Sequence, residues 1–317
     1  MFSPPKVMPV KRTVGRAMPL LACCAMCVCG GLWSCSGPAP ERGRLRVTAS
    51  IFPLADVVRA IGGQHVEVDV LIPPGASPHV FEPSPEVYRR FSESRLFVMV
   101  GAGMEFWAEK LIAASAGPEP RIIRAADGVE LIQAAGYDRP APEHRHRSGN
   151  PHVWLDPLLV DTLAVRICRA LTELDPGQAE AYSRNLSRFH EQLGGLHRSI
   201  QQAVDRFGVR EYVAFHPSWS YFARRYGLRE AGIIQRSPGR DPTPRQIEEI
   251  IGAIERYRIR AVFAEPQFNP SAAEAIAQET GVKVFLLDPL GGPDLPGRDS
   301  YIALMYHNLE IMREAMQ

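Results

Sequence analysis

Short apolar runs rich in β-branched residues alternate with helical segments along most of this 317-residue chain. In the run at residues 65–72, Val or Ile occupies every second position, which is typical of a strand. Strands that alternate with helices form parallel sheets with helices on both faces. The pattern therefore predicts an α/β lobe over residues 44–174. Its expected strands are residues 45–50, 65–72, 96–100 and 121–124, and its expected helices are 54–61, 85–91, 106–114 and 157–174.

A second series of the same kind follows later in the chain and predicts another α/β lobe over residues 209–317. About 270 residues follow Arg44, which is more than one hydrophobic core usually organises. Two lobes are therefore expected. The second has expected strands at residues 212–215, 232–235, 261–264 and 282–287, and expected helices at 221–226, 244–257, 272–280 and 301–316.

The segment between the lobes, residues 175–208, has apolar residues at spacings of four and three. It begins with Asp175 and Pro176, a pair typical of a helix start, and Gly208 ends it. About 32 helical residues would extend about 48 Å. A coiled coil is the alternative, but the flanking strand and helix segments favour a linker. The expected fold is α/β, with two Rossmann-like lobes, each with a parallel sheet, joined by one long rigid helix.

Residues 1–35 have the character of a secretory signal, because four basic residues precede an apolar run at residues 17–33. The run ends in Leu-Trp-Ser-Cys, which resembles the lipobox of bacterial lipoproteins, although Trp33 is bulky for that motif. The prediction is a lipoprotein with its lipid on Cys35 and a tether at residues 36–43. The alternative is an uncleaved membrane anchor, since residues 17–33 are marginally long enough to span a membrane.

The charge and cysteine content exclude some function classes. The chain has 36 basic and 35 acidic residues, and the leader takes away basic residues only, so a nucleic-acid partner is not expected. Five of the six cysteines lie in residues 1–35, where they are read as apolar filler and the lipidation site rather than as a metal site. Cys168 alone remains in the folded part, so an intramolecular disulfide is excluded.

Several metal-competent side chains fall where expected strands end. His216 and Asp288 directly follow strands, and His79 lies just beyond another. Ligands bind at the carboxyl ends of strands in open α/β sheets. His152 lies in a loop between Pro151 and Pro157, and prolines restrict the backbone of a ligating loop. A single His is more often an ordinary hydrogen-bonded residue, so the prediction depends on the whole set.

Three neutral imidazoles and one carboxylate suit a divalent ion of intermediate softness, zinc first. The chain has neither a His-Glu-x-x-His pair nor an Asp-rich oxygen cage, so a zincin protease and a calcium site are not indicated.

The chain resembles the zinc and manganese substrate-binding proteins of bacterial ABC importers. The resemblance covers most of Val47 to Met316. It is carried by the motifs at residues 77–83, 150–157, 215–222, 265–268 and 287–290. It implies a cation held between the lobes by His79, His152, His216 and Asp288.

The same resemblance implies partners and location. They are a membrane permease driven by a cytoplasmic ATPase, with the receptor exported to the periplasm or cell surface and held by its lipid anchor. A monomer that makes and breaks no bond is expected, with cargo released through modest local movement.

Manganese-preferring members of this family tend to have a carboxylate at the third ligand, whereas His216 favours zinc. Mn²⁺ or Fe²⁺ remains the alternative cargo. The chain departs from the zinc members in two ways: Pro78 replaces an acid before the first ligand, and only His144 and His146 remain of a His-rich loop. The pair could form a weak collecting site, but a solvated loop is the preferred interpretation. Asp288 is thus the expected fourth ligand, with Glu265 or water as substitutes.

Other residues near these motifs are expected to support the site. Trp154 and Trp219 are predicted to wall it, or to pack in the core, and Phe81 and Phe222 are interpreted in the same way. Asp156 and Glu82 are candidates to accept the second N–H of a ligating imidazole, or to cap a helix.

Two other functions remain as alternatives. One is a zinc hydrolase with an open coordination position, for which Glu265 is the obvious general base. The other is an adhesin-like surface protein.

Overall fold

The computed structural model describes residues 43–114, 119–133, 149–236 and 241–317. The predicted signal at residues 1–35 with Cys35, nearly all of the tether, and the pair His144 and His146 lie outside the described residues. Within the described ranges, no helix is both long enough and apolar enough to cross a membrane.

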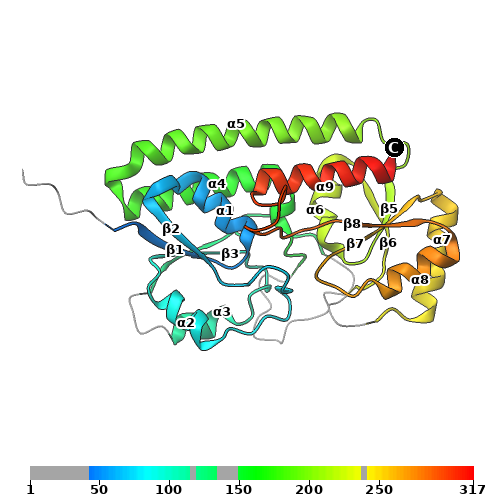
Figure 1. The fold of residues 1–317 in the computed structure, drawn as a ribbon, viewed down its shortest axis with the longest axis horizontal. Coiled ribbons are helices and arrows are strands. Elements are labelled where there is room, and N and C mark those ends of the chain that lie inside the picture. The colour runs from blue at the N-terminus through cyan, green and yellow to red at the C-terminus, as the bar shows by residue number, and fades with distance from the viewer. Residues whose placement is uncertain (1–42, 115–118, 134–148, 237–240) are drawn as a thin grey trace, which may run out of the picture. The chain divides into compact units, whose positions relative to one another are not determined.

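The first lobe contains a sheet of four parallel strands in the order β2-β1-β3-β4. Helices α1 and α4 pack on one face, and α2 and α3 lie on the other side (Figure 1). β2 begins one residue later than predicted, because His65 belongs to a 3-10 turn. The elements are β1 (Leu45–Ala49), α1 (Phe52–Gly62), β2 (Val66–Val70), α2 (Pro85–Ser92), β3 (Leu96–Met99), α3 (Ala108–Ala113), β4 (Arg121–Arg124) and α4 (Pro157–Leu174).

The second lobe repeats this arrangement with four parallel strands in the order β6-β5-β7-β8. β6 starts three residues before its predicted start at residue 232. It is an edge strand, so it tolerates polar residues and a glycine that hide it in the sequence pattern. The elements are β5 (Glu211–Ala214), α6 (Ser220–Tyr226), β6 (Arg229–Ile233), α7 (Pro244–Tyr257), β7 (Ala261–Ala264), α8 (Ser271–Thr280), β8 (Lys283–Leu286) and α9 (Tyr301–Met316).

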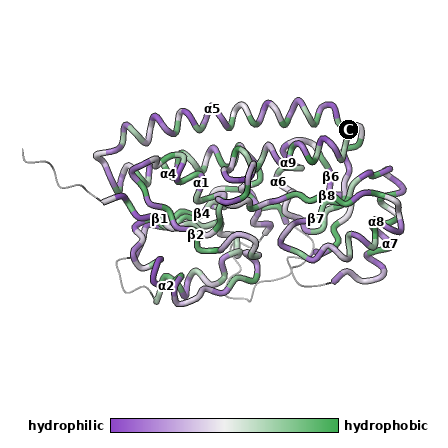
Figure 2. Tube along the Cα trace, in the orientation of Figure 1, coloured by the Kyte–Doolittle hydropathy of each residue, from purple (hydrophilic) through white to green (hydrophobic). Residues whose placement is uncertain are grey.

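Helix α5 (Ala179–Val204) connects the lobes and packs along helices of both (Figure 1). It has 26 residues, so it extends about 39 Å. The helix is shorter than predicted because the segment Pro176–Gln178 forms a 3-10 turn, where Gly177 disfavours a continuous α-helix. Hydrophobic and hydrophilic residues alternate along this helix in the tube coloured by hydropathy (Figure 2). The predicted stripe is buried: Tyr182, Phe189, Leu193, Leu196, Ile200 and Ala203.

One hydrophobic core runs through both lobes. It joins Val98 of β3 to Leu193 of α5 and to Phe263 of β7. Helix α9, at the end of the chain, contributes by packing against α5 and also against α1 of the first lobe. A large apolar interface restricts the relative motion of lobes. The shared core therefore favours local movement over wide hinge opening.

Candidate metal centre

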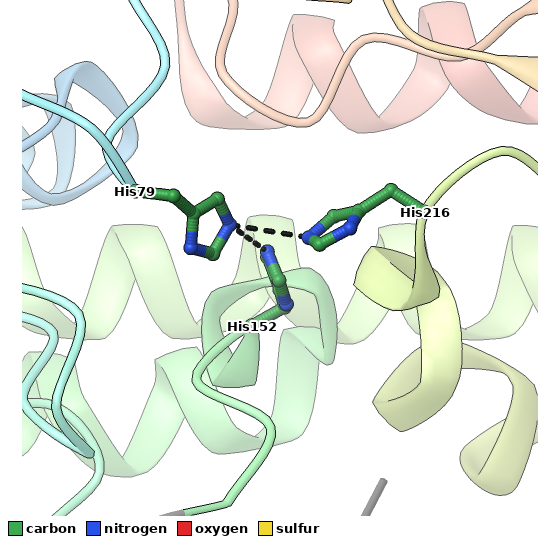
Figure 3. A group of neighbouring side chains, drawn as sticks. All are labelled: His79, His152 and His216. Atoms are coloured by element: carbon green, nitrogen blue, oxygen red, sulfur yellow. Dashed lines mark hydrogen bonds between the residues drawn. The ribbon is translucent and has the colours of Figure 1, made fainter. Parts of the chain in front are cut away.

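Three histidines from distant parts of the chain meet between the lobes (Figure 3). His79 lies in the loop between β2 and α2, and His216 directly follows the residue after β5. His152 precedes the 3-10 turn Val153–Leu155, which leads into α4. His79 Nε2 lies 3.2 Å from His152 Nε2 and 3.1 Å from His216 Nε2. In the part of the chain that the structure describes, these are the residues that form a metal-competent group of three.

The separations between the ring nitrogens match a shared metal ion. Two nitrogens bound to one tetrahedral zinc at about 2.0–2.1 Å lie about 3.3 Å from each other. The rings are tilted against one another by 56°, 72° and 79°, so they do not stack. Three imidazoles therefore direct their Nε2 atoms towards one point.

The electrostatic environment keeps these imidazoles uncharged. Burial lowers the pKa of His79 to about 4. Burial, and then repulsion from the neighbouring imidazoles, holds the pKa of His152 and of His216 well below 6.5. Neutral imidazole is the form that binds a metal ion. The site is thus ready to bind a cation near neutral pH without first losing protons from the three rings.

The His152 ring is held by a hydrogen bond on its other nitrogen, since His152 Nδ1 lies 2.8 Å from Asn150 Oδ1. Asn150 is a site residue that the sequence pattern alone does not predict. Its position two residues before a His, in an Asn-Pro-His motif, was the available signal. Hydrogen bonds of this kind orient metal ligands.

Asp288, the predicted fourth ligand, lies outside the group of three histidines. Its Oδ2 accepts a hydrogen bond from Arg298 Nη1 at 2.9 Å. Its Oδ1 accepts from the backbone N–H groups of Leu290 and Gly291, each at 3.0 Å, and from Gln267 Nε2 at 3.3 Å. The buried carboxylate is therefore already satisfied, and Arg298, ten residues away, was not apparent as its partner.

Glu265 lines the same cavity as His79 and His152. The Ser218 hydroxyl donates a hydrogen bond to its carboxyl group. Burial, aided by the negative charge of Asp288, raises the pKa of Glu265 to about 8. The side chain is mostly protonated at pH 7, and a bound cation would favour its ionised form.

The cavity beside the histidines is small. Its volume is about 10 Å³, which is about the space that one water molecule requires. Trp154 lines it, and the Trp154 ring centroid lies 5.1 Å from that of His152. The cavity thus holds one water-sized species and has no room for a larger organic substrate.

Of the other residues predicted to support the site, Trp219, Phe222 and Phe81 pack against aromatic rings, and Glu82 is exposed. Trp219 is buried and packs edge-on against Phe222, and Phe81 packs in the same way against Trp107. Glu82 is exposed, and in the described residues it makes no hydrogen bond to the three imidazoles.

Asp156 caps α4 instead of orienting a histidine. Its Oδ1 accepts from the Leu158 backbone N–H at 2.9 Å, and its carboxylate pairs with Arg225 of α6 at 2.9 Å. The same segment makes further contacts with the second lobe, since Trp154 Nε1 donates to the Pro289 carbonyl at 2.8 Å. The turn that carries His152 is therefore bound to both lobes.

Two parallel-sheet lobes with a three-histidine centre between them define a two-lobed metal-binding α/β protein. A family model described as zinc-uptake complex component A, periplasmic (ZnuA), matches residues 47–315. The chain belongs to this family.

Relatives and solved structures agree with that assignment. The high-affinity zinc uptake system protein ZnuA of Yersinia pestis is 30% identical over 274 residues, which cover 81% of this chain and 86% of that protein. The zinc-binding lipoprotein AdcA of Streptococcus pneumoniae is 24% identical over 89% of this chain. The chain spans only 58% of AdcA. A crystal structure of ZnuA has a TM-score of 0.76 and 32% identity, and the match covers 86% of this chain and 100% of that one.

The lowered pKa values predict that the metal-free protein loses stability as the pH falls from 6.5 towards 4. Below pH 6.5 the unfolded chain binds protons that the folded chain does not, so the free energy of unfolding decreases as the pH falls. Urea unfolding between pH 7 and 5 measures this slope. Each His→Asn substitution at residues 79, 152 and 216 should reduce it by up to about 1.4 kcal/mol per pH unit. An unchanged slope in the triple variant would contradict the prediction.

The contacts of Asp288 predict a structural role that a simple metal ligand would not have. We expect Asp288→Asn to lower the free energy of unfolding of the metal-free protein by about 2–3 kcal/mol, because a mostly buried Arg298 loses its partner. Asp294→Asn, at an exposed acid in the same loop, is the control and should change it by less than about 0.5 kcal/mol. Equal stability of the two variants would show that Arg298 does not depend on Asp288.

Proposed function

We propose that the chain is the substrate-binding component of an ABC-type importer, which captures Zn²⁺ between its lobes and delivers it to a membrane permease driven by a cytoplasmic ATPase. One observation carries this proposal: three neutral imidazoles from both lobes, two of them buried and one partly buried, converge at the spacing of a single zinc ion. Membership of the zinc-uptake family and the name of the Yersinia pestis relative support the role and the cargo.

The ligands in this proposal are His79, His152 and His216. For the fourth coordination position the geometry favours Glu265 or a water molecule, because Glu265 lines the cavity. Asp288 would first have to give up Arg298 and two backbone N–H groups. A carboxylic acid with a pKa of about 8 can release its proton when the cation arrives.

Zinc is the proposed cargo because a site of three imidazoles suits a softer ion than Mn²⁺. Affinity alone does not identify the physiological metal, since zinc binds most such sites more tightly than manganese or iron(II) does. Competitive titration with Zn²⁺, Mn²⁺ and Fe²⁺, compared with metal-limited growth, separates the alternatives.

A hydrolase is the weaker candidate. Its general base would be Glu265, which is mostly protonated at pH 7, and the cavity has no room for a hydrolysable substrate. Both observations favour a receptor that is not an enzyme.

The proposal places the receptor outside the cytoplasmic membrane, in the periplasm or at the cell surface, as a monomer anchored by a lipid on Cys35. The basic and apolar leader supports export, and the Streptococcus pneumoniae relative is named a lipoprotein. The shared core supports release by local movement.

The purified chain should bind about one Zn²⁺, and His79→Ala, His152→Ala and His216→Ala should each weaken binding at least about tenfold, or about 1.4 kcal/mol. Competition with a fluorescent zinc chelator measures the affinity. His190→Ala, at an exposed residue of α5, is the matched control and should bind zinc like the unchanged protein. Full affinity in all three site variants would rule out the proposed ligands.

Transport has its own test in a bacterium that contains the matching permease and ATPase but lacks this chain. In zinc-chelated medium the unchanged gene should restore growth, and a gene with all three His→Ala substitutions should not, because its product cannot load the permease. Added zinc should restore growth of the triple variant. Restoration by manganese alone would instead assign manganese as the cargo, and normal growth of the triple variant would exclude the transport role.

A further inference from the structure

The side chain of Asn150 lies between two of the proposed ligands. It is fully buried. Its Oδ1 lies 2.8 Å from His152 Nδ1 and 3.0 Å from the His152 backbone nitrogen. Its Nδ2 lies 2.5 Å from the carbonyl oxygen of Pro217, the residue after His216, and 3.0 Å from Ser220 Oγ.

These neighbours determine which way the Asn150 amide points. A backbone N–H can only donate a hydrogen bond, and a backbone carbonyl can only accept one. Oδ1 must therefore face the His152 backbone N–H, and Nδ2 must face the Pro217 carbonyl. The reversed amide would place two donors together at His152 and two acceptors together at Pro217, which would leave buried polar groups unsatisfied.

The direction of the amide in turn determines the tautomer of His152. An amide oxygen can only accept, so the hydrogen of the neutral imidazole must be on Nδ1. Nε2 then carries the free lone pair, and it is Nε2 that lies 3.2 Å from His79 Nε2 at the metal centre. In the other tautomer, Nε2 would carry a hydrogen and could not bind an ion.

The backbone of Asn150 is also held from both lobes. Its N–H donates to the Ile132 carbonyl at 2.8 Å, and its carbonyl accepts from the Tyr221 hydroxyl of α6 at 2.7 Å. The same hydroxyl accepts from the Ile132 N–H at 3.1 Å. This closed ring of hydrogen bonds fixes Asn150 at the contact between the lobes.

We propose that Asn150 is a positioning residue that keeps His152 in the Nδ1-protonated tautomer, and that the Pro217 carbonyl of the second lobe sets the direction of its amide. The link to zinc affinity rests on the proposed function, whereas the tautomer is a property of the metal-free protein. Separation of the lobes would remove the Pro217 acceptor from Asn150 and release the constraint on a ligand of the first lobe.

The tautomer can be measured by NMR on the metal-free chain with ¹⁵N-labelled histidine, since protonated and unprotonated ring nitrogens have separate shifts. The unchanged protein should show a hydrogen on His152 Nδ1. Asn150→Ala should lose this preference, and its zinc affinity should fall about 10- to 100-fold. Asn150→Asp keeps an acceptor at Nδ1, so it should retain the tautomer and bind zinc within about tenfold of the unchanged protein. Its second carboxyl oxygen would face the Pro217 carbonyl, so this variant should be less stable.

Tyr221→Phe is the matched control, because it removes the hydroxyl bonded to the Asn150 backbone but leaves the side-chain amide in place. It should lower stability and keep the tautomer. If Asn150→Ala fails to fold, Asn150→Asp and Tyr221→Phe still test the proposal, because both variants must keep the hydrogen on His152 Nδ1.

Two results would overturn the proposal: an unchanged tautomer and zinc affinity in Asn150→Ala, or loss of the tautomer in Asn150→Asp. If the chain has the expected tautomer but binds no zinc, the positioning role of Asn150 is supported and the proposed cargo is refuted.

Discussion

The convergence of three uncharged imidazole nitrogens, 3.1 and 3.2 Å apart, is the interaction on which the rest of the structure depends. Burial takes these nitrogens out of water, and this costs free energy unless a hydrogen bond or a cation compensates for it. The surrounding protein must therefore hold the rings in place until a cation lies between them. The two sheets position the loops that carry His79 and His216, and the side chain of Asn150 holds the His152 ring from behind.

The lobes are connected by more than a linker helix. A continuous apolar core crosses from one sheet to the other through α5 and α9. Polar contacts of the His152 turn lie beside this core, including the ion pair of Asp156 with Arg225 and the bond from Trp154 to the Pro289 carbonyl. A small shift of the turn would therefore alter hydrogen bonds made to both lobes.

Much of the fold could be predicted from local patterns. The bounds of α4, α7, α9, β4 and β7 agree with those expected from periodicity and from Pro and Gly positions. β6 was predicted too far along the chain because an edge strand lacks a continuous apolar run. The three histidines could be found because they follow strand ends or lie beside prolines. The partners of Asp288 and the role of Asn150 could not, since their contacts come from residues that no local pattern connects.

The sequence by itself determined which side chains could bind a metal, that two parallel-sheet lobes carry them, and which family the chain resembles. Only the tertiary structure decided the chemical state of those side chains. The low pKa of the histidines, the protonated Glu265, the tautomer of His152 and the pairing of Asp288 with Arg298 all depend on burial and on neighbours from elsewhere in the chain. Residue type determines what a group can do, whereas solvation and hydrogen-bond partners, which exist only after folding, determine which form it takes.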